Sequence, residues 1–210
     1  GLVDIGGLIH NLPSIDAIVA HKGIIRHFQD VHTPFVMHMS ASTIHGGHHA
    51  DDKVLIGSVA EAIGYGAHAV SVQVNLGSIH EAQMLERLGE ISTQCAEMDM
   101  PLLGMIYPRG PNLSIQTDDI TSGIMHCARL GWELGCDVVK VPWTGDTESF
   151  AIVRSSVPIP VLVAGGSDDG DLGTFYSTIE QSMLAGANGV CVGRQVFNAD
   201  NPNEVASRIM

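Results

Sequence analysis

The chain has 210 residues, 45% of them hydrophobic, which is enough for one domain with a sizeable buried core. Its 23 acidic and 10 basic side chains give a net charge of -13, which repels nucleic-acid backbones and anionic lipid surfaces. No apolar run approaches the roughly 18 residues that cross a bilayer, and no basic-then-apolar signal opens the chain. We therefore expect a cytoplasmic protein with no nucleic-acid or membrane partner.

Strand and helix patterns alternate along the chain. The predicted strands cover residues 17–20, 35–39, 69–74, 102–107, 138–141, 161–164 and 189–192. The predicted helices cover 53–65, 80–98, 120–134, 147–155 and 175–185, with only a short helical patch between 23 and 34. Strands separated by helices favour parallel pairing through right-handed crossovers, which predicts an α/β fold.

Three of these helices end in the same kind of phrase before the next strand. The phrases begin at Gly64, Leu134 and Ala185, and in each a glycine stops the helix ahead of an apolar strand. This repetition is typical of a βα unit. An open doubly wound sheet is the competing fold, but its Gly-x-Gly-x-x-Gly nucleotide loop is absent from the sequence. The pattern favours a (β/α)8 TIM barrel.

Lys140 stands in the middle of the apolar run Val138–Val141, which reads as a buried parallel strand. An unpaired ammonium is costly to bury, and a depressed pKa would leave a neutral amine able to form a Schiff base with a carbonyl. The alternative is a lysine that reaches water at a strand end. The chain has only three lysines, so we expect this one to be functional.

In a β/α barrel the chemistry belongs to the carboxyl ends of the strands. Tyr107 ends a predicted strand next to that of Lys140, where its phenol could transfer protons or simply pack with its hydroxyl in water. Gly165, Gly166, Gly193 and Arg194 follow the last two predicted strands. Their backbone N–H groups and the guanidinium predict a phosphate site.

Three other groups have simpler interpretations. His45, His48 and His49 lie in a glycine-rich loop on the same face, but their spacing does not match a rigid metal site, so we expect no metal and no cofactor. Asp146 or Thr147 is expected to cap the following helix. The four cysteines are widely spaced and are expected to be buried thiols in a reducing compartment.

The motifs together resemble the archaeal-type class I (Schiff-base) aldolase family, DeoC/FbaB-like. They are DVVKVPWTGD around Lys140, MIYPRG around Tyr107, HKG at 21–23, SAST at 40–43, VNLGS at 74–78, VAGG at 163–166 and VGRQVF at 192–197. Within that family the chain looks most similar to the 2-amino-3,7-dideoxy-D-threo-hept-6-ulosonate synthases and the 2-amino-4,5-dihydroxy-6-oxo-7-phosphonooxyheptanoate synthases. The fructose-bisphosphate aldolases share the YPRG and lysine-TGD phrases and are the nearest alternative.

The resemblance implies an aldolase or transaldolase with a role in aromatic amino acid biosynthesis. Lys140 would form a Schiff base with a phosphorylated ketose, Tyr107 would move protons, and the enamine would add to an aldehyde such as aspartate semialdehyde. Gly165, Gly166, Gly193 and Arg194 would hold the donor phosphate. The resemblance also implies a homo-oligomer, such as a decamer.

One feature departs from the family. The family's first barrel strand, which ends in Asp-His-Gly, precedes the segment that matches the start of this chain. We therefore expect residues 1–210 to form a single TIM-barrel domain that lacks its first strand, as an N-terminally truncated enzyme would. A non-catalytic phosphosugar-binding subunit, which kept the phosphate loops after losing the aspartate, is the alternative from another functional class.

Overall fold

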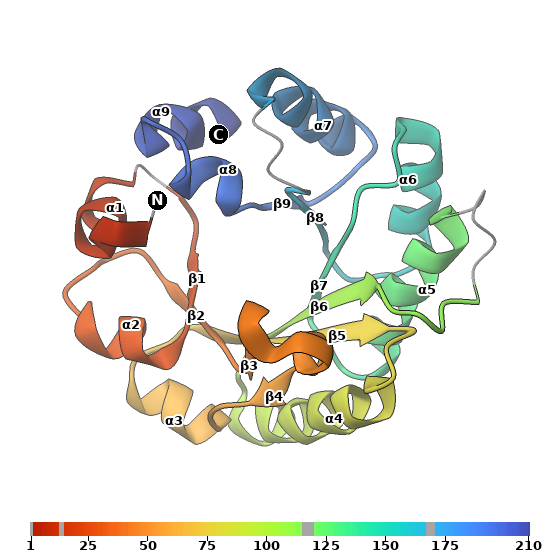
Figure 1. The fold of residues 1–210 in the computed structure, drawn as a ribbon, viewed down its shortest axis with the longest axis horizontal. Coiled ribbons are helices and arrows are strands. Elements are labelled where there is room, and N and C mark those ends of the chain that lie inside the picture. Colours follow the sequence, from red (N-terminus) through yellow and green to blue (C-terminus); the bar gives the residue numbers. More distant parts are fainter. Residues whose placement is uncertain (1, 13–14, 115–119, 167–170) are drawn as a thin grey trace.

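A computed structural model describes residues 2–12, 15–114, 120–166 and 171–210. In this part of the chain the main sheet has seven parallel strands, in the order β1-β2-β5-β6-β7-β8-β9. The sheet curls around a central axis with the helices on its outer side (Figure 1). The strands are β1 (Ile18–Ala20), β2 (Phe35–His38), β5 (Ala69–Leu76), β6 (Leu102–Pro108), β7 (Val138–Val141), β8 (Val161–Ala164) and β9 (Gly189–Cys191).

The seven predicted strands all form, and the predicted α/β fold is confirmed. The end strands β1 and β9 each have one partner in the described sheet and are not paired with each other. The sheet is therefore a TIM-barrel sheet that stays open between its first and last described strands. Within the same residues, no helix combines the length and the apolar character that crossing a membrane requires.

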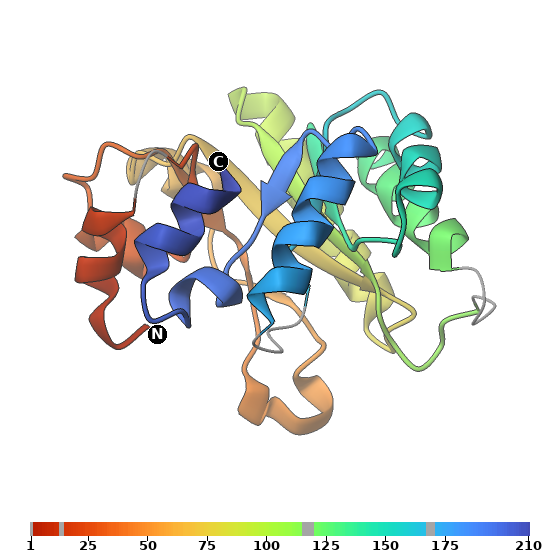
Figure 2. The same cartoon turned by 90° about the horizontal axis from the view of Figure 1, so that it is seen from above.

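The helices that follow the strands cover the outer face of the sheet (Figure 1). They are α2 (Lys22–His27), α3 (Val59–Gly64), α4 (Glu81–Met98), α5 (Ile120–Glu133), α6 (Thr147–Ser155), α7 (Leu172–Leu184), α8 (Arg194–Phe197) and α9 (Pro202–Ile209). The N-terminal helix α1 (Ile5–Asn11) lies beside α9, so the two ends of the chain are close together (Figures 1 and 2).

The prediction of a helix over residues 53–65 is wrong in its first part. β3 (Ser40–Ala41) and β4 (Val54–Leu55) pair as an antiparallel hairpin, and α3 begins only at Val59. Ser58 caps α3, because its Oγ accepts a hydrogen bond from Glu61 N at 3.2 Å. The hairpin carries the 3-10 helix η2 (Ile44–His49) and projects beyond the carboxyl ends of the barrel strands (Figure 2).

The repeated helix ends form as predicted. Gly66, Gly135 and Gly186 follow α3, α5 and α7 with φ angles of 76°, 91° and 92°. The next residue in each case donates its N–H to a carbonyl five residues back, as in Ala67 N to Ala62 O at 3.0 Å. A side chain would be strained at this backbone angle, so glycine ends each helix and turns the chain into the next strand.

Candidate active site

Alternation along β7 decides where Lys140 points. Val139 and Val141 are fully buried, and Val139 packs on Gly131 of α5 outside the sheet. Successive strand residues face opposite sides, so Lys140 faces the interior of the curled sheet. None of the ion pairs among the described residues includes Lys140. The amine therefore lies inside the barrel without a described carboxylate partner.

Strand register places two polar groups on the same inner face as Lys140. Met105 of β6 is level with Lys140, and Gly189 of β9 is level with Leu162, the neighbour of Lys140 on β8. Tyr107 and Cys191 each lie two residues further along, which is about 7 Å closer to the carboxyl end on the same face. The Lys140 side chain reaches up to this level, close enough to Cys191 and Tyr107 for both to act on its pKa.

The expected depression of the lysine pKa is wrong for this arrangement. Burial acts to lower the pKa of Lys140, but the neighbouring Cys191 and Tyr107 act to raise it, and the net shift is upward. Opposite charge and hydrogen bonding to the ammonium outweigh the loss of solvation. Lys140 is thus held as an ammonium, and it must give up a proton before it can attack a carbonyl.

Tyr107 is a weaker acid here than in water. Burial raises the pKa of its phenol, and the nearby Lys140 only partly offsets this rise. The guanidinium of Arg109 lies 5.4 Å from the centre of the Tyr107 ring, where a cation is attracted to the ring face. Near neutral pH the phenol therefore keeps its proton and can donate it.

Polar side chains below and beside Lys140 were not found from the sequence. His38 of β2 bonds through Nδ1 to Ser71 Oγ of β5 at 2.9 Å, and burial is the main reason that its pKa falls to about 4. Gln73 Nε2 donates to Asn75 Oδ1 at 2.9 Å further along the same face. The available signal was the alternation of Ser71, Gln73 and Asn75 with valines, which places one polar face on β5.

The loops after β8 and β9 meet at the same end of the barrel. Arg194 Nη2 donates to Gly166 O at 2.7 Å, and Gln195 Nε2 donates to Gly165 O. A Cβ at Gly165 would lie 2.9 Å from Val192 Cγ1, and one at Gly193 would lie 2.6 Å from Phe197 Cζ. The contact between Gly165 and Val192 and the two hydrogen bonds bring the four predicted phosphate residues together. Ser167, which follows them in the sequence, lies outside the described residues.

His45, His48 and His49 lie on the β3–β4 hairpin and not on the inner face that carries Lys140. His45 and His49 are exposed on η2, and the His49 ring packs against His80 with their centres 5.7 Å apart. The side chain of His48 lies outside what the structure describes. Among the described residues, His, Cys, Asp and Glu side chains form no cluster of three or more with a geometry that could hold a metal ion.

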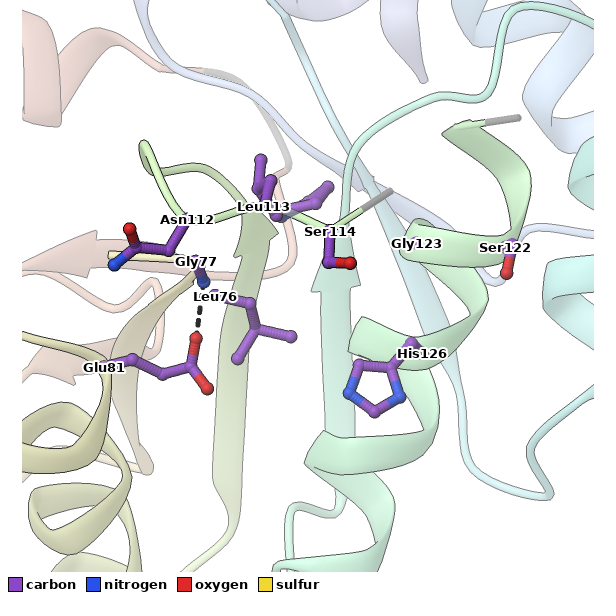
Figure 3. A pocket seen from close by; sticks show the side chains of 10 residues that line it. Leu76, Gly77, Glu81, Asn112, Leu113, Ser114, Ser122, Gly123 and His126 are labelled. Carbon is purple, nitrogen blue, oxygen red and sulfur yellow. Dashed lines mark hydrogen bonds between the residues drawn. The ribbon is translucent and has the colours of Figure 1, made fainter. Parts of the chain in front are cut away.

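A surface cavity of about 630 Å³ lies beside the barrel, between the first turns of α4 and α5 (Figure 3). Glu81 accepts a hydrogen bond from Gly77 N at its edge, and His126 lies on its α5 side (Figure 3). None of the predicted site residues lines this cavity. The surface cavity and the Lys140 group therefore lie in different places. We take the inner face of the sheet as the candidate site, because Lys140, Tyr107 and Cys191 lie together there.

The sequence family of the chain follows from direct comparison. The model of the DeoC/LacD family aldolases matches residues 5–199. The 2-amino-3,7-dideoxy-D-threo-hept-6-ulosonate synthase 1 of Archaeoglobus fulgidus is 41% identical over 198 residues, which cover 93% of this chain and 72% of the relative. The 2-amino-4,5-dihydroxy-6-oxo-7-(phosphonooxy)heptanoate synthase of Streptomyces griseus is 35% identical, over 93% of this chain and 71% of its own.

Solved structures agree with this relationship. An archaeal fructose 1,6-bisphosphate aldolase superposes with a TM-score of 0.87 at 28% identity, over 98% of this chain and 80% of its own. A further structure of such an enzyme, with the same score, identity and coverage, has its catalytic lysine covalently bound to the carbinolamine intermediate of its substrate. The resemblance inferred from the motifs is confirmed, and the chain belongs to the DeoC/LacD aldolase family.

Proposed function

We propose that this protein is a class I aldolase or transaldolase of the amino-heptulosonate synthase type. Lys140 forms a Schiff base with a phosphorylated ketose, and the enamine adds to an aldehyde such as aspartate semialdehyde. The observation that carries the proposal is the position of Lys140 inside the barrel, next to Tyr107 and on the side of the sheet that carries the glycine loops. The names of the relatives from Archaeoglobus and Streptomyces support the synthase reaction.

In this mechanism Lys140 first loses its proton, and its Nζ attacks the ketone carbon. The carbinolamine loses water to give an iminium, which draws electrons from the neighbouring C–C bond as that bond breaks. Tyr107 exchanges a proton with the substrate oxygen on the far side of that bond. The enamine that remains on Lys140 attacks the acceptor aldehyde, and water then releases the product and restores the amine.

The loops after β8 and β9 bind the donor phosphate in this proposal. Gly165, Gly166 and Gly193 supply close-approaching backbone, and Arg194 supplies the cation. A phosphate fixed there would hold the ketone carbon against Lys140, which converts binding energy into orientation of the reacting atoms.

Fructose-bisphosphate cleavage is the second candidate reaction. It is favoured by the likeness to archaeal fructose 1,6-bisphosphate aldolases and by a Thermoproteus tenax class 1 enzyme that is 32% identical over 184 residues. The higher identity to the synthases places it second. A non-catalytic phosphosugar-binding barrel is the alternative outside the enzymes.

Borohydride reduction in the presence of fructose 1,6-bisphosphate tests the proposal. We expect a covalent adduct on the peptide that contains Lys140, detected by mass spectrometry, and no adduct in the Lys140→Met variant. Lys22→Met is the matched control, because Lys22 pairs with Glu61 at 3.2 Å and is half-exposed, and it should trap normally. Ligand binding without an adduct would support the binding subunit. Product analysis with aspartate semialdehyde or glyceraldehyde 3-phosphate as acceptor separates the two reactions.

The remaining expectations complete the proposal. Residues 1–210 act as one TIM-barrel aldolase domain, and the protein assembles into a homo-oligomer, for which sedimentation gives the mass. All four cysteines are free thiols, which suits a reducing compartment such as the cytoplasm. The proposed synthase activity would serve aromatic amino acid biosynthesis.

A further inference from the structure

Cys191 is the one cysteine of the chain that is not buried. Its strand β9 is short, and register with Ala164 of β8 places its side chain on the inner face, at the level of Tyr107. The other three thiols, Cys95, Cys127 and Cys136, are at most 4% exposed and are packed in the core between sheet and helices. The position of Cys191 therefore differs from that of a packing residue.

The Lys140 amine lies between two groups that can accept or donate a proton. Register places Tyr107 of β6 and Cys191 of β9 on the same inner face as the amine, and both act to raise its pKa. The phenol is needed at the substrate oxygen once the C–C bond reacts, as proposed above. Formation and loss of the carbinolamine need a second proton carrier beside the amine, and the Cys191 thiol lies on the same inner face and acts on that amine.

We propose that Cys191 is a catalytic residue that carries the proton during Schiff-base formation on Lys140. The inference rests on the proposed aldolase function and deepens it. In the proposed step the Cys191 sulfur, in its deprotonated form, takes one proton from the Lys140 ammonium, and the neutral amine attacks the ketone. The carbinolamine oxygen, after it receives the second amine proton, accepts the thiol proton and leaves as water. The products are the iminium, one water molecule and the regenerated thiolate, so protons and charge balance.

The other titratable groups around this pair are cations or weak bases. His38 faces it from β2, with its imidazole neutral above about pH 4. Lys53 reaches toward the interior from the β3–β4 hairpin, and burial lowers its pKa. Arg109 lies beyond Tyr107 on the β6 loop. On β5 the inner face carries Ser71, Gln73 and Asn75, and on β8 it carries Leu162 and Ala164, none of which titrates. Among the described groups on these strands, Cys191 and Tyr107 are the two acidic side chains that act on Lys140.

Single-turnover trapping with fructose 1,6-bisphosphate and borohydride, measured from about pH 6 to pH 9, tests this role. In Cys191→Ala we expect the plateau rate of iminium formation to fall on the order of 10²-fold, because no acid assists loss of water. The acid limb should also move to lower pH, since Cys191 acts to raise the pKa of Lys140 and the variant removes this effect. Cys191→Ser replaces the thiol with a hydroxyl that does not ionise between about pH 6 and pH 9, so it should behave like Cys191→Ala. Cys95→Ala, which removes a thiol far from the amine, should keep the wild-type profile.

Alkylation gives a second readout that does not depend on turnover. Iodoacetamide should label Cys191 of the native wild-type chain, and the label should be lost once the ketose adduct on Lys140 has been reduced. A wild-type chain that traps no ketose overturns both the function and this role. If the wild type traps but Cys191→Ala or Cys191→Ser keeps its rate and profile, or if the adduct leaves labelling unchanged, the role of Cys191 alone is overturned.

Discussion

His38 is partly buried close to several basic side chains, and its pKa is lowered. Its ring lies on the inner face of β2, 5.3 Å from the His21 ring and bonded to Ser71 Oγ. Burial is the main cause of its lowered pKa, and the nearby His21, Lys140 and Lys53 lower it further. A neutral imidazole beneath Lys140 avoids a second cation in the interior. The residue therefore contributes to the site by staying uncharged.

The lowered pKa of His38, about 4 against 6.5 in the unfolded chain, predicts a loss of stability in mild acid. Between these values the unfolded state binds a proton that the folded state does not, so stability falls as pH decreases below 6.5. From pH 7.5 to pH 5 the loss from this residue is on the order of 2 kcal/mol.

Urea unfolding of His38→Gln at the two pH values measures this effect. The variant should lose less stability than the wild type, while His10→Gln, at an exposed position, should lose as much as the wild type. An equal pH dependence in all three proteins would contradict the prediction.

At the scale of elements, the contact between α5 and β7 fixes the strand that bears Lys140. Gly131 of α5 packs directly on Val139, and a Cβ there would lie 2.5 Å from Val139 Cγ1. Ile106 of β6 is on the same side, 3.5 Å from that Cβ. The glycine lets α5 and β7 approach closely. The distance between this helix and this strand in turn fixes the position of the Lys140 amine inside the sheet.

Gly131→Ala should therefore destabilise the protein although alanine favours helix. Overpacking against a fully buried valine costs about 1–3 kcal/mol, while the helix gains about 1 kcal/mol. We expect a lower urea midpoint for Gly131→Ala and slower trapping on Lys140. Gly89→Ala in α4 is the matched control, because its Cβ would meet no atom within 4 Å, and its midpoint should rise. A Gly131→Ala midpoint at or above that of the wild type would disprove the close contact.

For the whole molecule, charge is distributed unevenly. The net charge is -13, yet Lys53, Arg109, Lys140 and Arg194 all lie at the carboxyl end of the curled sheet or reach toward it. They are four of the ten basic side chains. These four cations favour the approach of anionic substrates to the candidate site.

Salt should weaken substrate binding if this local field dominates. The Debye length falls to about 8 Å at physiological ionic strength, so added NaCl screens the attraction between the four cations at the carboxyl end of the sheet and a bisphosphate. We expect KM for fructose 1,6-bisphosphate to rise several-fold between about 0.05 and 0.3 M NaCl. The rise should be smaller in Arg194→Gln. A KM that falls with salt would mean that the net negative charge controls approach.

The sequence alone determined the strand and helix order, the barrel class and the family. These depend on periodicity, on glycines that need φ near +80°, and on short motifs, all of which are local properties. It also predicted Lys140 and Tyr107 as site residues, because a lysine in an apolar run and a tyrosine at a strand end differ from the residues around them. The hairpin at 40–55 was missed because its two-residue strands are too short to show a period.

The groups that surround the amine depend on how the strands come together in three dimensions. Cys191 and Tyr107 come from strands 84 residues apart in the chain, and register brings both to the level that the Lys140 side chain reaches. Their proximity reversed the expected shift of the Lys140 pKa, since burial alone would have lowered it. A pKa is set by charges and solvent in three dimensions, and no spacing along the sequence encodes those distances.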